Sequence, residues 1–260
     1  MEKLLCDSLQ FDEPTHVYSL TDEPQLELTS ATTFIHRWFA PFEREKIAQK
    51  LISNVPKYAN CTPEELYAEW KQSGISGTNV HAALEDFIIK FAEDGTDDYD
   101  IHLQKHCKTD VEIAKAKHGM EWLIEKVFQK KHLVLMPEVK VVSRDYKIAG
   151  MMDLLVHNTE TDEYSILDWK TNKRISKTSY GDAKGIRYAT EKIDDCNFMH
   201  YTLQLSLYRY ILERDYGLKI KNQALIHLSE DRATVMQTEY DQACIVNMFQ
   251  EAIKLGEIKW

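Results

Sequence analysis

Residues 147–170 read KIAGMMDLLVHNTETDEYSILDWK, two apolar runs joined by a polar, turn-forming segment. The first run reaches Asp153, and the second ends in Asp168-Trp169-Lys170. Side chains alternate with a period of two along a strand, so Asp168 and Lys170 must point to the same face. An acid beside a base, with a second acid on the preceding strand, predicts two carboxylates holding a divalent metal next to a lysine.

The surrounding pattern predicts an α/β fold with a central mixed sheet between helices. Three strands, separated by turn-forming segments, form an antiparallel meander. A helix precedes them, and a helix, a strand, a second possible strand and a last helix follow. The expected ranges are a helix at 110–131, strands at 133–143, 147–157 and 164–170, a helix at 198–216, strands at 221–228 and 233–239, and a helix at 241–255.

The N-terminal part reads as an extension of short strands and helices. We expect strands at 16–20 and 25–29, a helix from the hydroxyl-rich 29–33 to about Phe39, and helices at 42–54 and 63–73. A further helix carries His81 and the apolar stripe that continues to Phe91. We therefore divide the chain into an extension, 1–73, and a core, 74–260. An extension that roofs the site would force a substrate to thread a free end.

Composition indicates an ordinary globular protein, with 43% hydrophobic and 28% charged residues. No apolar stretch is long enough to span a membrane and no signal peptide is evident, so we expect an intracellular protein of undetermined compartment. The five cysteines are scattered and form no CxxC pair, which indicates neither a zinc site nor a disulfide framework.

Charge is unevenly distributed along the chain. The net charge of −10 argues against broad, non-specific adhesion to nucleic acid, yet residues 169–192 carry +5. Lys173, Arg174 and Lys177 follow the acid pair directly and could draw the phosphates of a polyanion. A solvated charged loop explains the same residues equally well.

Phosphodiester hydrolysis needs an activated water and stabilisation of the leaving oxygen, and carboxylate-held divalent metals supply both. Asp153 and Asp168 fit as ligands of Mg²⁺ or Mn²⁺, and the Trp169 carbonyl could add a third oxygen. Lys170 could orient or deprotonate the water, or stabilise developing charge. The competing interpretation is a strand-end cap and a structural salt bridge.

Several other side chains could join this site, each with a structural alternative. His81 could bind metal or phosphate, and Glu85, one helical turn later, could hold a metal-bound water. Glu138 could add an acid, whereas Gln204 and Tyr208 share a helix face and could position a phosphate or Lys170. Ser30 and Thr32 could receive a phosphate at a helix start, although plain helix capping is the simpler role.

Taken together, these residues resemble the PD-(D/E)XK nuclease superfamily in its RecB-type exonuclease branch. The resemblance covers about 74–230, because five motifs occur in the family's order; a looser likeness to single-domain members of the mitochondrial genome maintenance exonuclease type extends to the N-terminus. The motifs are Gly77-Thr78-x-x-His81, Glu138, Gly150-x-x-Asp153, Asp168-x-Lys170 and Gln204-x-x-x-Tyr208.

The resemblance implies a restriction-endonuclease-like core (α-βββ-α-β) and a Mg²⁺- or Mn²⁺-dependent deoxyribonuclease using one or two ions. It further implies an exonuclease acting on single strands or DNA ends in replication, recombination or repair. The implied metal ligands are His81, Asp153, Asp168 and the Trp169 carbonyl. The implied catalytic lysine is Lys170, supported by Glu138, Gln204 and Tyr208.

The same resemblance limits the cofactors and partners. Four cysteines that hold an iron–sulfur cluster in one subset are missing, so we expect no cluster. Expected partners are DNA and replication or recombination proteins, with no membrane, for a monomer or small oligomer. The alternatives are a catalytically inactive, nuclease-fold subunit that binds DNA or acts as a scaffold, and a hydrolase of another phosphate ester.

Overall fold

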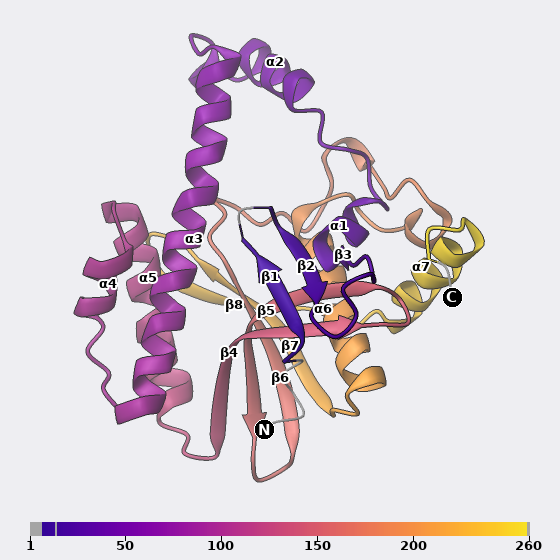
Figure 1. Ribbon diagram of the computed structural model, residues 1–260. Helices are drawn as coiled ribbons and strands as arrows, with labels where there is room; N and C mark the ends of the chain where they lie inside the picture. The colour runs from indigo at the N-terminus through magenta and orange to yellow at the C-terminus, as the bar shows by residue number, and fades with distance from the viewer. Residues whose placement is uncertain (1–6, 14, 259–260) are drawn as a thin grey trace.

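A mixed six-stranded sheet forms the centre of the protein in a computed structural model that describes residues 7–13 and 15–258 (Figure 1). The strand order is β3-β5-β6-β7-β8, and β4 pairs with β5. The strands are β3 (Thr29–Ser30), β4 (Leu133–Ser143), β5 (Ile148–Asn158), β6 (Glu163–Lys170), β7 (Ile220–Leu228) and β8 (Ala233–Gln237).

The predicted meander is confirmed, because β4 pairs antiparallel with β5 and β5 antiparallel with β6. The sheet is mixed because β7 lies parallel to β6, after a crossover through α6 (Asn197–Asp215). This arrangement confirms the α/β fold class with a mixed central sheet flanked by helices.

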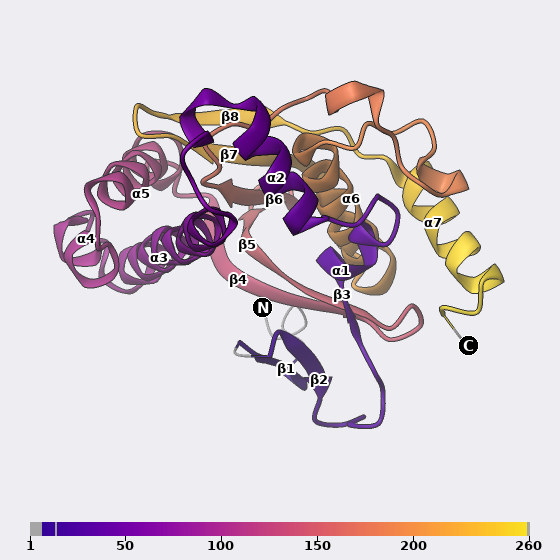
Figure 2. The same cartoon turned by 90° about the horizontal axis from the view of Figure 1, so that it is seen from above.

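Helices cover both faces of the sheet (Figure 2). One apolar core lies between the sheet and α1 (Ala31–His36), α6 and α7 (Gln242–Lys254). The other lies between the sheet and α3 (Pro63–Asp94), α4 (Asp100–His106), α5 (Asp110–Leu123) and the π-helical turn 124–128. None of the helices in the described ranges combines the length and apolar content needed to cross a membrane.

The helix expected at 63–73 does not end there, because α3 continues without a break to Asp94. Glycine in a helix interior costs about 1 kcal/mol, and Gly74 and Gly77 made an interruption the simpler expectation. The helix begins with a capping box between Thr62 and Glu65 and ends at Gly95, whose φ of 74° suits glycine. The division of the chain at residue 73 stays a prediction, and one helix crosses it.

One further expectation was wrong at the N-terminus. The strand at 16–20 exists as β2 (Val17–Leu20) and pairs with β1 (Leu9–Asp12), whereas only Thr29 of the strand expected at 25–29 enters a strand. The hairpin β1–β2 lies against β4 (Figure 1). The short helix α2 (Arg44–Asn54) and a 3-10 turn, Pro56–Tyr58, then lead to α3.

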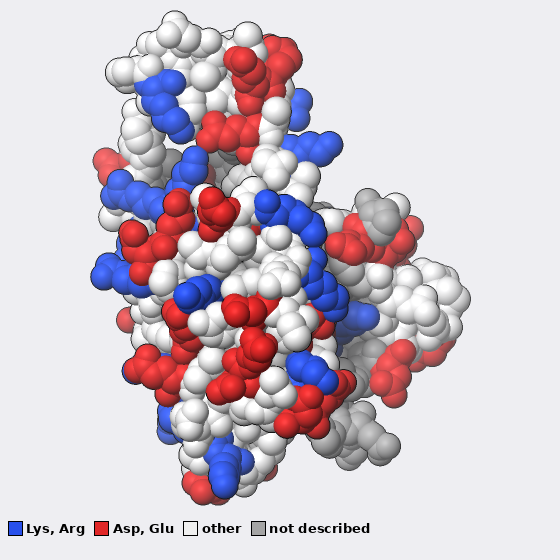
Figure 3. All heavy atoms as spheres, turned by 90° about the vertical axis from the view of Figure 1, so that its left-hand side faces the viewer, with Lys and Arg blue, Asp and Glu red and all other residues white. Residues whose placement is uncertain are grey.

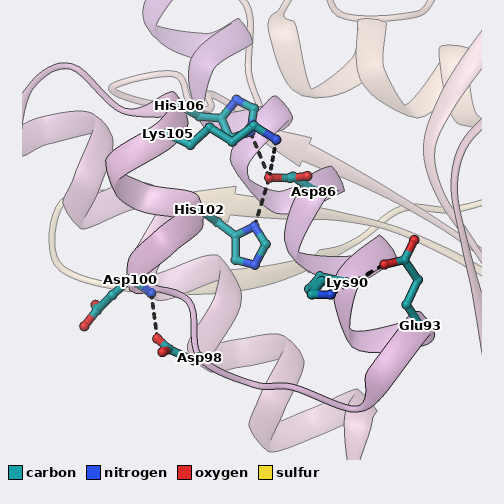
Figure 4. A network of polar contacts seen from close by, with 8 residues as sticks. All are labelled: Asp86, Lys90, Glu93, Asp98, Asp100, His102, Lys105 and His106. Atoms are coloured by element: carbon teal, nitrogen blue, oxygen red, sulfur yellow. Dashed lines mark hydrogen bonds and ion pairs between the residues drawn. The ribbon is translucent and has the colours of Figure 1, made fainter.

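Helix α4 is an element that the sequence pattern did not indicate. Its anchor is Asp86 of α3, whose Oδ2 accepts from His102 Nδ1 at 3.0 Å, Lys105 Nζ at 2.9 Å and His106 Nε2 at 3.1 Å (Figure 4). These three donors come from one side of α4, so a single carboxylate holds the helix against α3.

Candidate active site

Three acids lie in a row across adjacent strands, at the middle of β4 and β5 and near the end of β6. The pairs Pro137–Leu154 and Val139–Met152 place Glu138 of β4 opposite Asp153 of β5. The last pair of β5 with β6 is Leu154–Leu167, so Asp168 stands opposite Asp153 one step beyond it. The structure therefore brings together the three acids that the sequence singled out.

Glu138 has an unusual backbone conformation, with φ at +49° inside a strand. Residues other than glycine rarely adopt this left-handed region, and such strain accumulates at functional sites. The regular pairing of β4 with β5 omits Glu138, although both neighbours pair. The backbone irregularity thus coincides with the acid that faces Asp153.

Asp168 and Lys170 share one face of β6, as the period of two predicted. The Lys170 ammonium contacts Asp168 Oδ2 and lies 4.5 Å from the centre of the Tyr201 ring. Trp169 points the other way into the core, where it is 2% exposed and meets Trp122 edge-on at 6.0 Å. The lysine is held between an acid and an aromatic face.

Asp153 is held from two sides. Its Oδ2 accepts a hydrogen bond of 2.7 Å from the Trp169 backbone N–H, and its Oδ1 lies 3.4 Å from Nδ1 of His81. His81 projects from the middle of α3, where its neighbour Val80 is fully buried in the core. The helix stripe therefore positions the histidine over the row of acids.

Burial and the neighbouring charges shift the pKa values of the three acids in the row. Burial, reinforced by the charge of Asp153, raises the pKa of Glu138 to about 8. Burial also raises the pKa of Asp168 to about 6, although Lys170 opposes the shift. Burial alone would raise the pKa of Asp153, but His81 and Lys170 outweigh it and lower the pKa.

Helix α6 supplies the predicted pair Gln204 and Tyr208. Gln204 Nε2 donates to the Tyr208 hydroxyl at 3.1 Å, and Tyr208 is buried. The Tyr208 ring packs directly on the backbone of Gly150, where an added Cβ would lie 2.5 Å from a ring carbon. Gly150 in the motif Gly150-x-x-Asp153 is thus required for this close approach.

An open cleft of about 800 Å³ leads to the acids. Its walls come from α3, from β4 and β5, and from the β1–β2 hairpin. The lining residues include Phe11, Glu13, Gly77, Thr78, His81, Glu85, Glu138, Lys140 and Asp153. Glu85, also singled out from the sequence, lines this cleft and adds negative charge beside Glu138.

The residues predicted to bind DNA make contacts that differ from one residue to the next. Lys173 pairs with Glu69 of α3 at 3.0 Å, and the Lys177 ammonium lies 4.8 Å from the Phe198 ring centre. The Arg174 carbonyl accepts from Asn197 Nδ2 at the start of α6. Ser30 caps α1 by accepting from the Thr33 N–H at 3.1 Å, which supports the capping alternative, and Thr32 is exposed.

Two tyrosines near the site were not among the predicted site residues. Tyr201 lies under the Lys170 ammonium, and its hydroxyl donates to Asn172 Oδ1 at 2.9 Å. It precedes Gln204 by three residues, so the helical face of Gln204 and Tyr208 could have indicated it. Tyr18 of β2 lies close enough for Glu138 to raise its pKa after burial, to about 12, and no local pattern signals that tertiary contact.

The acids form no preassembled metal cage: within residues 7–13 and 15–258, no three His, Cys, Asp or Glu side chains gather as a ligand set. Cationic groups of the chain itself, His81 and Lys170, sit against Asp153 and Asp168 instead. The donor chemistry nevertheless fits a hard divalent ion. Burial and mutual repulsion of the three carboxyl groups raise the pKa of Glu138 and Asp168, and a bound cation would relieve that repulsion.

Fold and site together define an α/β protein with a row of acids across three adjacent strands and one lysine at the end of β6. A model of the PD-(D/E)XK nuclease superfamily matches residues 33–255, and the chain belongs to this superfamily. No curated protein matches the chain. Among solved structures it is similar to SSO0001, at 15% identity over 65% of this chain and 69% of that one, with a TM-score of 0.30. It is also similar to a "putative exonuclease" from Eubacterium rectale, at 13% identity over 96% and 88%, with a TM-score of 0.49.

Proposed function

We propose that the protein is a metal-dependent deoxyribonuclease of the RecB-type branch, acting as an exonuclease on single-stranded DNA or DNA ends. The observation that carries this proposal is the row Glu138, Asp153 and Asp168 with Lys170 beside it, next to an open cleft. Membership of a nuclease superfamily implies a nucleic-acid substrate.

Asp153 and Asp168 would hold the ion, Mg²⁺ or Mn²⁺, with His81 and the Trp169 carbonyl as further ligands. A bound ion supplies an activated water and stabilises negative charge on the phosphate oxygens. The hydrogen bond from the Trp169 N–H fixes one Asp153 oxygen and leaves the other directed at His81. Glu138 adds a third carboxylate and Glu85 a fourth at the cleft wall.

Lys170 would bind a phosphate oxygen or the attacking water through its ammonium group. Tyr201 shields one side of that group, and Asp168 orients it from another. Gln204 is fixed by Tyr208 and is the side chain of this pair that remains partly accessible. The basic residues after Lys170 then follow the substrate's backbone away from the acids.

The decisive experiment compares wild type with Asp168→Ala and Lys170→Ala on end-labelled linear DNA, with Mg²⁺ or Mn²⁺. We expect each substitution to lower cleavage by about 100-fold or more, because one stabilising group in a low-dielectric site is worth that much. Circular dichroism checks folding, and Glu160→Ala, an exposed acid in the β5–β6 turn, serves as the matched control.

Release of labelled terminal nucleotides would distinguish exonuclease from endonuclease action. Full cleavage by a folded Asp168→Ala protein would overturn the assignment. A wild-type protein that binds DNA but cleaves none with either metal would instead be a DNA-binding subunit with a nuclease fold. Partner proteins in replication or recombination, and a monomer or small oligomer, remain predictions.

A further inference from the structure

Helix α2, the turn 56–58 and residues 63–73 of α3 project beyond the sheet, and we call this part the overhang (Figure 1). Its chemistry plays no part in the catalytic proposal. Phe42, at its base, is 66% exposed, and Tyr180, in the segment after β6, is 81% exposed. Large rings held in water on one side of a molecule mark an interaction surface.

The rings of the overhang form a continuous aromatic surface. The Phe42 and Trp70 ring centres are 5.5 Å apart, and those of Tyr67 and Trp70 are 5.7 Å apart. The Arg44 guanidinium lies 3.9 Å from the Tyr67 ring centre. Flat apolar faces therefore alternate with a fixed positive charge.

A second contact joins this surface to the segment that follows the catalytic strand. The Lys50 ammonium of α2 lies 4.2 Å from the centre of the Tyr180 ring. Lys173, three residues after Lys170, pairs with Glu69 of α3 at 3.0 Å. The aromatic surface is thus connected to the end of β6, where the site lies.

The excess positive charge beside this surface lies in the segment that follows β6, because residues 42–73 themselves carry five bases and five acids. Residues 169–192 carry +5 in a protein of net charge −10, whereas the α3–α5 side of the molecule shows acids and bases intermixed (Figure 3). Single-stranded nucleic acid offers negative phosphates together with unpaired bases that stack on aromatic rings, whereas a duplex keeps its bases stacked inside.

We propose that Phe42, Tyr67, Trp70 and Tyr180, with Arg44 and Lys50, form a stacking platform for the bases of a single-stranded nucleic acid. This platform rests on the proposed nuclease function, since it would hold the strand whose phosphodiester reaches Lys170. Trp70 precedes His81 by eleven residues in one helix, which is about 17 Å at 1.5 Å per residue. The stacked bases therefore lie several nucleotides away from the bond that is cleaved.

The test measures binding separately from cleavage, with the full chain in EDTA. The probes are a fluorescein-labelled oligothymidylate of about 20 nucleotides, longer than the roughly 4–16 nucleotides of such binding sites, and an abasic strand with the same number of phosphates. Phe42→Ala and Tyr180→Ala remove exposed rings and so leave the core intact. Ile101→Ala, which removes a 66% exposed side chain from α4, is the matched control.

We expect wild type and Ile101→Ala to prefer oligothymidylate over the abasic strand. Each ring variant should bind oligothymidylate about tenfold more weakly, because stacking on one aromatic ring contributes roughly that factor. The affinity of the ring variants for the abasic strand should stay at the wild-type value. If the rings acted only through charge or local structure, binding of both strands would change together. Oligothymidylate affinities equal to wild type in both ring variants would overturn the platform.

The outcomes for platform and catalysis are separable. Ring-dependent binding by a wild-type protein that cleaves nothing would leave the platform standing and remove the nuclease assignment. Metal-dependent cleavage, together with DNA binding that the ring substitutions leave unchanged, would support the nuclease assignment and remove the platform. Equal affinity of the wild-type protein for oligothymidylate and the abasic strand, or no binding of either probe, would also refute the platform.

Discussion

At the scale of single residues, Gly150 controls how closely Tyr208 approaches the acids. A Cβ at this position would lie 2.5 Å from the Tyr208 ring, which is buried and has no room to move. We expect Gly150→Ala to lower the free energy of unfolding by about 1–3 kcal/mol, the usual cost of overpacking. Cleavage should fall as well, because Tyr208 positions Gln204.

Gly74→Ala is the matched control for this substitution. Gly74 lies inside α3 with nothing within 4 Å of an added Cβ, so alanine should raise stability by about 0.5–1 kcal/mol. Urea unfolding of both variants would measure the difference. If both substitutions changed the free energy of unfolding equally and in the same direction, the contact between Gly150 and Tyr208 would not constrain the site.

Glu138 carries the repulsion within the row of acids. Without metal and above pH 8, where Glu138 with its raised pKa of about 8 is ionised, Glu138→Gln should raise the melting temperature, because it removes a buried charge that faces Asp153 and Asp168. Mg²⁺ should stabilise wild type more than the variant, since a bound cation relieves the same repulsion. Thermal melts in EDTA and in Mg²⁺ measure both effects, with Glu160→Gln as an exposed control. A lower melting temperature for Glu138→Gln in EDTA would contradict this account.

How much of the site the sequence could predict differs from residue to residue. Asp153, Asp168 and Lys170 were predictable because period-two alternation on apolar strands fixes which side chains share a face. Tyr18 was not predictable, since its proximity to Glu138 depends on how a hairpin packs on a distant strand. The left-handed φ of Glu138 likewise has no local cause in the sequence.

At the scale of elements, the contact between α3 and α4 depends on Asp86, whose Oδ2 accepts from three donors of α4 (Figure 4). Asp86→Asn should lower the free energy of unfolding at neutral pH by about 1–3 kcal/mol. The substitution leaves His102, whose side chain is only 7% exposed, without its charged acceptor. Asp94→Asn, which affects an exposed pair with Lys90 in the same helix, should change stability less.

The effect of Asp86 should depend on pH. Burial alone would raise its pKa, but hydrogen bonds from Lys105, His102 and His106 outweigh burial and hold the pKa below the ordinary 3.8. A lowered acid pKa contributes stability above the ordinary value, and this contribution is lost as the pH falls through the folded-state pKa. The difference between wild type and Asp86→Asn in urea unfolding should therefore shrink below about pH 4. A constant difference down to pH 3 would contradict this mechanism.

Elements were predictable where local pattern and tertiary packing agree. The strands 133–143 and 164–170 match within one residue because long apolar runs end at clear turns. Helix α4 has seven residues and is mostly polar, so contacts with other elements stabilise it, through Asp86 and the burial of Leu103 in the core. Helix α3 continues through Gly74 and Gly77 because its buried stripe outweighs the cost of two glycines.

At the scale of the whole molecule, the segment 171–196 connects parts of the chain that lie far apart in sequence. The Ile186 N–H and the Thr190 hydroxyl donate to the Trp38 carbonyl, at 2.9 Å and 3.0 Å. Tyr180 contacts Lys50 of α2, and the same segment reaches α3 through Lys173. These contacts link α1, α2 and α3 around the end of β6, and no local sequence pattern could have indicated them.

If a strand reaches Lys170 by passing between these connected segments, it must enter by a free end. We expect a linear single-stranded DNA to be digested and a covalently closed circle of the same sequence to resist. Both substrates are incubated with wild-type protein and Mg²⁺, and the loss of intact DNA is followed on denaturing gels. Cutting the circle once, with a complementary oligonucleotide and a restriction enzyme, should restore digestion, because it creates an end without altering composition. Digestion of the intact circle at the rate of the linear strand would show that the segment 171–196 and the overhang open to admit DNA from the side.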